Sequence, residues 1–223
     1  MKIFLKRIYI FFSLAVLSNI SHAQPNLPFF NDMQNFKKQD SINPPPQHAI
    51  LFVGSSSFTK WKDVQDYFPG ATIINRGFGG SSLPDVIRYA KDIIFPYNPK
   101  QVVIYCGDND FASSDAVTAD TVIARVKKLF QMIRKKLPDA NIAYISIKPS
   151  PSRIRFMPKE EIANKAIKDF LAKQKNTAFI DVYHLMLTET GRPMPSIFLS
   201  DSLHMNANGY AIWKKAIEPY LIN

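Results

Sequence analysis

The sequence of 223 residues has only one cysteine, Cys106. A chain with a single thiol cannot form an internal disulfide, which excludes a small scaffold held together by disulfide bonds. The chain is long enough to do without them, because a domain of about 200 residues buries roughly 70–75% of the surface that its unfolded form exposes. We therefore expect one globular domain with a self-sufficient core.

Long hydrophobic runs are also lacking. The apolar stretch IYIFFSLAVL at residues 8–17 is well short of the roughly 20 residues that a membrane-spanning helix needs. It follows the basic start MKIFLKR and precedes a short polar stretch that ends in Ser21-x-Ala23, which is the order of a secretory signal peptide. We predict that residues 1–23 are such a peptide, that the mature chain has no integral membrane segment, and that the protein is exported to a periplasm or to the extracellular space.

Acidic residues are fewer than basic ones, 18 against 28, and the formal net charge is +10 at pH 7. Many of the basic residues lie in helix-like stretches such as 127–136, where a solvated helix face accounts for them. No nucleic-acid-binding motif accompanies the charge, so we predict no nucleic-acid partner. Candidate metal ligands are too scattered for a zinc site, and Asp108, Asp110 and Asp115 do not form an EF-hand pattern. We therefore predict neither a metal nor a cofactor.

The chain is expected to have three parts. Residues 24–47 follow the signal peptide, are rich in Pro and Asn, and end in three consecutive prolines before Gln47. We interpret them as a lead-in segment, which Phe29, Phe30 and Phe36 attach to the domain. The domain itself is expected at residues 48–223.

Short β-rich segments alternate with helical ones in this domain. The β-rich segments are continuous apolar runs, which are typical of strands covered on both faces. Apolar residues at spacings of three and four predict the helices between them. Five strands alternating with helices predict an α/β fold: a three-layer α/β/α sandwich around a five-stranded parallel sheet. We expect strands at residues 49–53, 72–74, 102–105, 142–145 and 178–180, and helices at 117–137, 162–171 and 207–221.

Ligands bind beyond the carboxyl ends of the strands in such folds, and a run of serines at residues 55–57 directly follows the first expected strand and Gly54. A serine hydroxyl is a poor nucleophile until a base removes its proton. The sequence has only four histidines that could be this base. Of these, His22 leaves with the signal peptide, and His48 precedes the first strand, at the wrong end of the sheet.

The two remaining histidines are His184 and His204. Each has an aspartate three residues earlier, Asp181 and Asp201 respectively. A carboxylate at this spacing can hold the tautomer of the imidazole and stabilise the imidazolium. Spacing alone cannot choose between the two pairs. The Gly-x-Ser-x-Gly elbow of α/β-hydrolases is absent, although the order Ser, Asp, His is shared with them.

Acyl transfer also needs hydrogen-bond donors for the oxyanion of the tetrahedral intermediate. A glycine backbone N–H and an asparagine side-chain amide suit this task. Gly79 and Gly80 follow the second expected strand, and Asn109 follows the third, within Gly107-Asp108-Asn109-Asp110.

These blocks, in this order, resemble those of the SGNH (GDSL-like) hydrolase family, whose fold is a flavodoxin-like α/β/α sandwich. The resemblance covers residues 50–204. It implies that Ser56 is the nucleophile, His204 the general base and acid, and Asp201 its orienting partner. It further implies an oxyanion hole made by the backbone N–H groups of Ser56 and Gly80 and the side chain of Asn109.

The register of the resemblance leaves alternatives at three points. Ser55 stands where the family name has Asp, and Ser55 and Ser57 are alternatives as the nucleophile. Gly79 is the alternative oxyanion glycine. The family's Asp-x-x-His block lies just before the final helix, which disfavours the pair Asp181 and His184.

The resemblance implies a serine esterase without a cofactor. It is closest to members that act on short acyl chains, such as platelet-activating-factor acetylhydrolases and carbohydrate acetylesterases. We therefore expect hydrolysis of short-acyl, first of all acetyl, esters, with a small-molecule or glycan ester as substrate. The alternatives are a lysophospholipase or thioesterase acting on lipid acyl esters, and a non-catalytic glycan-binding protein on the same fold. Residues 146–153 resemble a segment common in exported bacterial members, to which we assign no role from the sequence.

Overall fold

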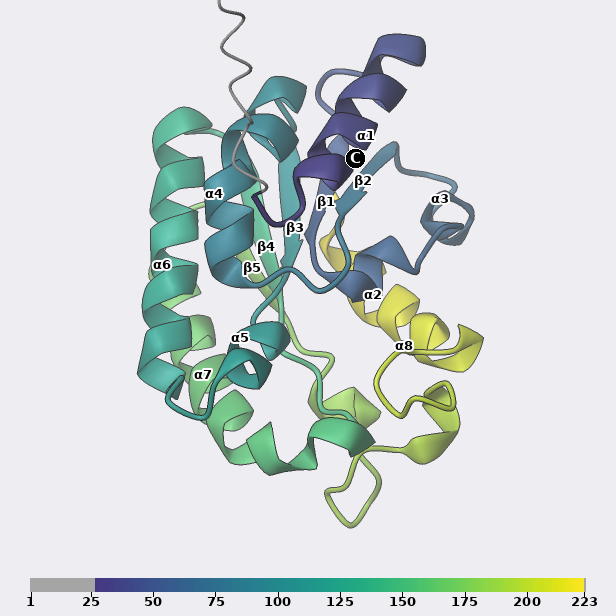
Figure 1. Ribbon diagram of the computed structural model, residues 1–223, viewed down its shortest axis with the longest axis vertical. Coiled ribbons are helices and arrows are strands. Elements are labelled where there is room, and N and C mark those ends of the chain that lie inside the picture. Colours follow the sequence, from purple (N-terminus) through teal and green to yellow (C-terminus); the bar gives the residue numbers. More distant parts are fainter. Residues whose placement is uncertain (1–26, 223) are drawn as a thin grey trace, which may run out of the picture.

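The structure is a computed structural model that describes residues 27–222 (Figure 1). The predicted signal peptide at residues 1–23 lies outside the described residues. Within them, no helix combines the length and the apolar character that crossing a membrane requires.

Five parallel strands form one sheet in the order β2-β1-β3-β4-β5. This arrangement confirms the predicted sheet and is the order of the flavodoxin-like doubly wound fold. Each strand pairs in parallel with its neighbours. The carboxyl ends of all five strands therefore lie at the same edge of the sheet. The strands are β1 (Ile50–Gly54), β2 (Ile73–Gly77), β3 (Gln101–Tyr105), β4 (Asn141–Ile145) and β5 (Thr177–Ile180).

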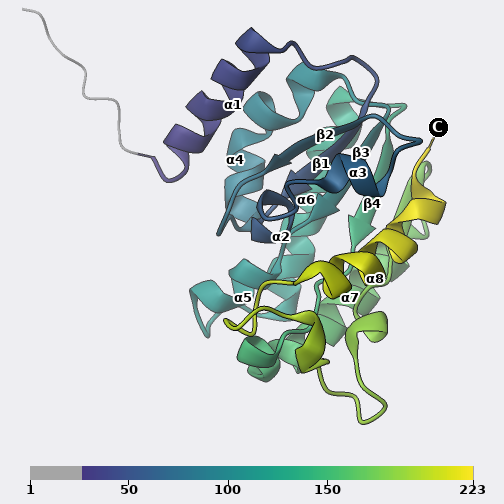
Figure 2. The ribbon, with the colours of Figure 1, turned by 90° about the vertical axis from the view of Figure 1, so that its right-hand side faces the viewer.

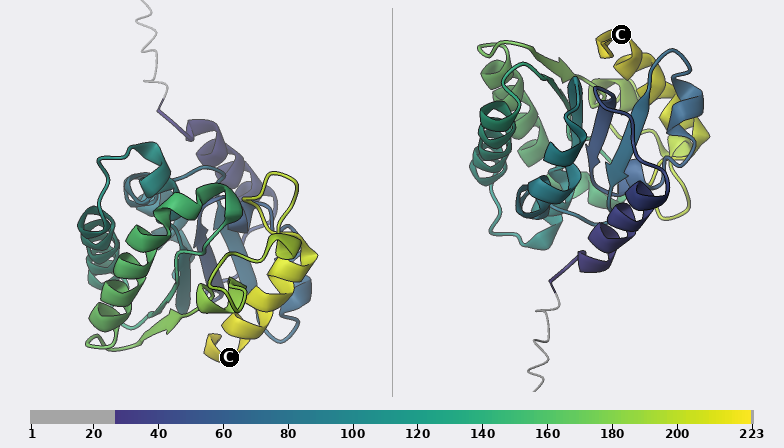
Figure 3. Two further views of the ribbon diagram at one scale, coloured as in Figure 1. Left: turned by 90° about the horizontal axis from the view of Figure 1, so that it is seen from below. Right: turned by 90° about the horizontal axis from the view of Figure 1, so that it is seen from above.

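Helices cover both faces of this sheet, which confirms the three-layer sandwich (Figure 3). One face packs against α4 (Leu83–Ile93), α6 (Ala119–Lys136) and α7 (Met157–Leu171). The other face packs against α2 (Ser56–Thr59), α3 (Val64–Tyr67) and α8 (Ala207–Ile217). Short elements complete the chain: α5 (Asp108–Ser113) and 3₁₀ turns at Phe95–Tyr97, Pro151–Phe156, His184–Met186, Pro195–Ile197 and Glu218–Tyr220.

The continuous apolar runs reflect burial on both faces. All five residues of β1 are buried. Leu51 and Val53 point into one hydrophobic cluster, and Ile50 and Phe52 point into the other. Successive side chains of a strand alternate between faces, so a strand with helices on both sides needs apolar residues throughout.

The longest helix, α6, shows why the basic residues gather there. Its buried stripe includes Val122, Val126 and Ile133, at the spacing of one helix face. Lys135 and Lys136 are exposed in its last turn, where cations interact favourably with the helix dipole.

The structure adds a helix, α1 (Phe30–Ile42), in the segment for which the sequence predicted only a lead-in. It lies along α4 beside the edge of the sheet (Figure 2). Phe29 and Phe36 pack against the core as predicted, and Phe30 is half-buried. The helix has no continuous apolar stripe, because Met33 is its only buried residue.

Polar contacts with the domain hold α1 in place. Asp40 near its end forms an ion pair with Arg76 of β2 and accepts a hydrogen bond of 2.6 Å from the Tyr97 hydroxyl. The Arg76 Nε donates to the same hydroxyl at 2.7 Å, and its guanidinium lies over the rings of Phe36 and Tyr97. This partly buried group ties the segment before the first strand to the sheet.

These contacts predict a pH dependence of stability. Burial, and then the hydrogen bond to Asp40, raise the pKa of Tyr97 to about 12, whereas an unfolded tyrosine titrates near pH 10. The stabilisation by the neutral hydroxyl is therefore complete below about pH 10 and is lost as the pH rises through about 12. We expect Tyr97→Phe to lose less stability than the wild type as the pH rises from about 9 to about 12, measured by urea unfolding. The exposed Tyr220→Phe is the matched control, and an equal loss in wild type and Tyr97→Phe would contradict the assignment.

Candidate active site

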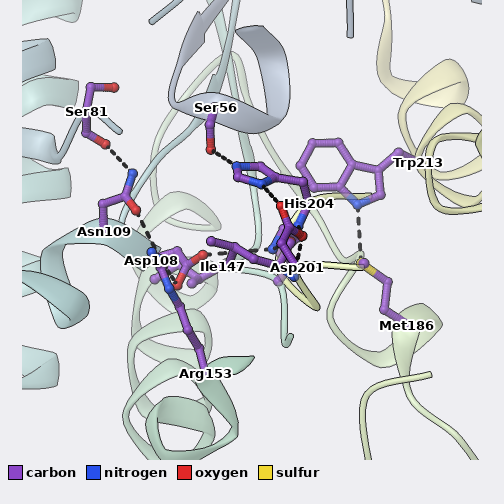
Figure 4. A network of polar contacts seen from close by, with 12 residues as sticks. Ser56, Ser81, Asp108, Asn109, Ile147, Arg153, Met186, Asp201, His204 and Trp213 are labelled. Atoms are coloured by element: carbon purple, nitrogen blue, oxygen red, sulfur yellow. Dashed lines mark hydrogen bonds and ion pairs between the residues drawn. The ribbon is translucent and has the colours of Figure 1, made fainter. Parts of the chain in front are cut away.

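The residues selected from the sequence come from four separate places on the chain, each following a strand or preceding the last helix, and Figure 4 shows Ser56, Asn109, Asp201 and His204 among them. Ser56 begins α2, directly after β1. Gly80 follows β2, and Asn109 lies in α5 after β3. Asp201 and His204 lie in the loop before α8.

The turn after β1 presents one of the three serines to solvent. Ser55 and Ser57 are buried, whereas Ser56 is half-buried. The Ser56 Oγ lies 3.0 Å from the Nε2 of His204. Gly54, the last residue of β1, has φ +144°, and a Cβ there would overlap the carbonyl oxygen of Tyr105 on β3. The sharp turn that exposes Ser56 therefore requires glycine at this position.

His204 is oriented by the aspartate three residues earlier. Its Nδ1 lies 2.6 Å from the Oδ2 of Asp201. The Oδ1 of Asp201 accepts hydrogen bonds from the backbone N–H groups of His204 at 2.9 Å and Leu203 at 3.0 Å. The side-chain bond to His204 and these two backbone bonds hold the pKa of Asp201 well below its usual range. Asp201 is thus an ionised carboxylate in the arrangement that fixes an imidazole tautomer.

The alternative pair has the same local geometry, but among the described residues His184 makes no hydrogen bond to a serine. His184 Nδ1 lies 2.7 Å from the Oδ2 of Asp181, and the Asp181 Oδ1 accepts from the His184 backbone N–H at 3.2 Å. The His184 side chain is 74% exposed. The pair borders a surface cavity of about 320 Å³ beside α7, together with Lys165 and Tyr183. The structure therefore brings His204, and not His184, to the serine turn.

Two of the three expected oxyanion donors, Gly80 and Asn109, lie in loops that are hydrogen-bonded to each other. The Nδ2 of Asn109 donates to the carbonyl of Ser81 at 3.0 Å, one residue beyond Gly80. This bond uses one of the two amide hydrogens, which leaves the second for a ligand. Gly80 has φ +83°, and the space that a Cβ would take there is open, whereas a Cβ on Gly79 would touch the Thr59 side chain. A substrate can therefore approach the backbone most closely at Gly80.

Asp110 holds the start of α4 in place next to the Gly79-Gly80 loop, a role that the sequence did not predict. Its Oδ2 accepts from the backbone N–H of Leu83 at 2.8 Å, and its Oδ1 lies 2.7 Å from Arg125. Burial raises the pKa of this carboxyl group. The first N–H groups of a helix lack partners within the helix, so Asp110 anchors the start of α4 just after the Gly79-Gly80 loop. Its adjacency to Asn109 was the only sequence signal.

A buried charge cluster, which we define as the buried Asp108, Lys148 and Glu160 with the partly buried Arg153, lies under these loops (Figure 4 shows Asp108 and Arg153). The Nη1 of Arg153 donates to the Oδ1 of Asn109 at 3.0 Å and lies 2.7 Å from the Oδ1 of Asp108. The segment 146–153, which had no predicted role, thus supplies two of the four members.

Lys148 links the two halves of the site. Its side chain is 2% exposed, and its Nζ lies 3.8 Å from the Oδ2 of Asp108. The same Nζ donates to the carbonyl of Leu203 at 2.9 Å, within the loop that carries Asp201 and His204. Burial lowers the pKa of Lys148, and nearby Asp108 opposes this shift.

Two other features of the described residues bear on ligands. Trp61 and Tyr105 are buried in the core rather than lining a pocket. Across residues 27–222, no group of three or more His, Cys, Asp or Glu side chains could hold a metal ion.

Comparison with known proteins identifies the family. The family model of GDSL-like lipases and acylhydrolases matches residues 50–212. Subunit alpha2 of platelet-activating factor acetylhydrolase IB from Rattus norvegicus is 25% identical over 174 residues, which cover 73% of this chain and 71% of that protein. The N-acylneuraminate cytidylyltransferase of Escherichia coli O18:K1:H7 is 28% identical over 176 residues, 75% of this chain. The match spans only 39% of the cytidylyltransferase.

Solved structures share the fold. An acylhydrolase from Bacteroides fragilis superposes with a TM-score of 0.75 at 20% identity, covering 86% of this chain and 96% of that one. A catalytic mutant of an acetylxylan esterase from Geobacillus stearothermophilus gives 0.63 at 14% identity, covering 78% and 94%. The α/β/α architecture predicted from the sequence is thus the architecture of these proteins.

The position of Lys148 predicts a large loss of stability on its removal. Lys148→Met leaves Asp108 with fewer counter-charges and the Leu203 carbonyl without its donor, so we expect a loss of about 3 kcal/mol in the free energy of unfolding. The matched control is Lys165→Met, which breaks the exposed ion pair with Asp169 and should cause no measurable change. Urea unfolding of both variants measures the difference, and equal stabilities would show that the Lys148 contacts are dispensable.

Proposed function

Since the chain belongs to the GDSL-like lipase/acylhydrolase family and is an ester hydrolase, we propose that Ser56, His204 and Asp201 form its catalytic triad. One observation carries this proposal: the 3.0 Å contact from Ser56 Oγ to His204 Nε2 continues through the 2.6 Å contact from His204 Nδ1 to Asp201. A hydroxyl, an imidazole and an ionised carboxylate that are hydrogen-bonded in this order constitute an activated nucleophile.

The proposed reaction is a two-step acyl transfer. Ser56 Oγ attacks the ester carbonyl while His204 Nε2 takes its proton, and Asp201 stabilises the resulting imidazolium. The negative oxygen of the tetrahedral intermediate is held by the N–H groups of Ser56 and Gly80 and the side-chain amide of Asn109. His204 then protonates the leaving alcohol, and an acyl-enzyme remains. Water, deprotonated by His204, hydrolyses this ester and restores Ser56.

The packing behind Ser56 favours a short acyl group. The rings that lie under α2 fill the space instead of lining a channel: Tyr105 contacts Trp213 at a centroid distance of 4.7 Å, and Phe58 contacts Trp213 at 6.2 Å. These three side chains are 0–1% exposed. A long acyl chain would need an apolar channel, which this filled core does not offer.

The open surrounding of the triad favours a bulky, hydrated alcohol such as a sugar. The Asp201 side chain is 46% exposed, and the space beside Gly80 is open. We infer that the substrate is an acetyl or similar short-acyl ester on a carbohydrate, which agrees with the names of the acetylhydrolase and acetylxylan esterase relatives. With the predicted signal peptide, the enzyme would meet such glycans in a periplasm or outside the cell.

The acyl preference is tested with p-nitrophenyl acetate, butyrate and octanoate. We expect the mature chain to prefer acetate, and Ser56→Ala to lower turnover by about 10⁴–10⁶-fold, because triad residues act as a unit. Preference for octanoate would favour the lysophospholipase or thioesterase alternative. No hydrolysis of any of the three esters, and no labelling of Ser56 by a fluorophosphonate, would favour a glycan-binding protein on the same fold.

The two Asp-x-x-His pairs provide an internal control for the base. His204→Ala should lower turnover on the acetate ester by about 10⁴-fold or more, because Ser56 loses its proton acceptor. His184→Ala removes an imidazole with the same local hydrogen bonds, and we expect its turnover to stay within about twofold of the wild type (surface changes are usually within about 0.5 kcal/mol). Loss of activity in the His184 variant alone would refute the assignment.

A further inference from the structure

The segment 146–153 has no part in the proposed acyl transfer, yet its Arg153 reaches the oxyanion side of the site. The Arg153 side chain is 17% exposed, and its Nη1 donates to the Oδ1 of Asn109. The same side-chain amide carries the proposed oxyanion donor at its other end. Arg153 therefore contacts the site through the amide of Asn109.

An asparagine amide has a donor end and an acceptor end of nearly equal shape. Turned by 180° about its last bond, Asn109 would direct its oxygen, a hydrogen-bond acceptor, toward the negative oxygen of the intermediate. Two contacts oppose this flip. The Ser81 carbonyl can only accept, so it selects the Nδ2 end. The guanidinium of Arg153 can only donate, so it selects the Oδ1 end.

We propose that Arg153 is a positioning residue of the oxyanion hole, which holds the Asn109 amide with its N–H directed at the reacting carbonyl. This inference rests on the proposed function, since it assigns Arg153 a role in the same acyl transfer. Arg153 acts through Asn109 and not by touching the substrate. A cation at the Oδ1 end also polarises the amide and strengthens its N–H as a donor.

Arg153 is itself held by the buried charge cluster. Its 2.7 Å contact with Asp108 is an ion pair without the angle of a hydrogen bond. Asp108 directly precedes Asn109 in α5, so one helix turn carries both the anchor of the guanidinium and the amide it orients. Lys148 contacts the other oxygen of Asp108, which keeps that carboxylate in place.

Glu160, the fourth member of the cluster, makes no hydrogen bond to the guanidinium. It is fully buried, and neither of its carboxyl oxygens has a hydrogen-bond partner among the described residues. Burial, and then the nearby Asp108, raise its pKa well above the usual range.

The inference predicts a specific kinetic pattern. The intermediate's charge exists only after attack, so loss of amide orientation should lower kcat and leave KM nearly unchanged. Removal of one oxyanion donor lowers kcat by about 10²–10³-fold in a comparable site, and this is the upper limit for a residue that acts through that donor. We expect Arg153→Ala to lower kcat on p-nitrophenyl acetate by about 10–100-fold within that limit.

A double-mutant cycle tests the route of the effect. If Arg153 acts through Asn109, the double variant R153A/N109A should be no slower than N109A alone, because the amide to be positioned is gone. Arg153→Lys, which keeps a donor for Oδ1, should recover part of kcat. Arg155→Ala is the matched control, since Arg155 is exposed in the same turn and its ion pair is with exposed Asp115.

The cycle distinguishes a positioning role from a structural one. The positioning role would be overturned if the effects of R153A and N109A on kcat multiply in the double variant. It would also be overturned if the main effect of R153A is a rise in KM. If R153A does not fold, as judged by its thermal unfolding transition, Arg153→Gln replaces it in the same cycle. If Ser56→Ala and Asn109→Ala keep full activity, the proposed function itself is refuted. If these two variants lose activity but R153A keeps the wild-type rate, only the role of Arg153 is refuted.

Discussion

The hydrogen bond between Ser56 and His204 imposes the main constraint on this fold, because it joins groups 148 residues apart in the sequence. The final helix α8 must therefore be held against the turn that follows the first strand. Two contacts achieve this: the Tyr210 hydroxyl donates to the carbonyl of Ser57 at 2.8 Å, and Trp213 packs edge-on against Phe58. The aromatic core under α2 thus positions the serine turn relative to the histidine loop.

The polar side of the site is built on buried charges, which rarely contribute much net stability because desolvation opposes their attraction. Their role here is to fix the relative position of two loops of the site. Lys148 contacts Asp108, next to the proposed oxyanion donor Asn109, and the Leu203 carbonyl, in the loop of the proposed triad residues Asp201 and His204. A hydrophobic residue of similar volume could fill the same space but could not fix the relative position of two loops. We infer that these charges as a set specify the geometry of the site, whereas removal of Lys148 alone is costly because it leaves its partners uncompensated.

The sheet could be predicted from the sequence because short, continuous apolar runs between periodic helices are typical of parallel strands buried on both faces. The helix α1 could not, since it buries only Met33 and depends on Asp40 meeting Arg76 and Tyr97, which are 36 and 57 residues away. The roles of Asp110 and Arg153 were missed for the same reason. Each acts through a contact with a distant residue, and neither residue type nor spacing reveals such a contact.

The two Asp-x-x-His pairs show most clearly what local sequence can decide. Both fold into the same hydrogen-bonded turn, with an Nδ1 contact of 2.6 Å for His204 and 2.7 Å for His184. The motif therefore encodes an oriented imidazole at both places. Only the loop before α8 brings that imidazole to a serine and, through Lys148, to the loops that carry the proposed oxyanion donors. Orientation of the base is thus a local property of four residues, whereas its proposed catalytic use depends on the sheet order and on the packing of the last helix.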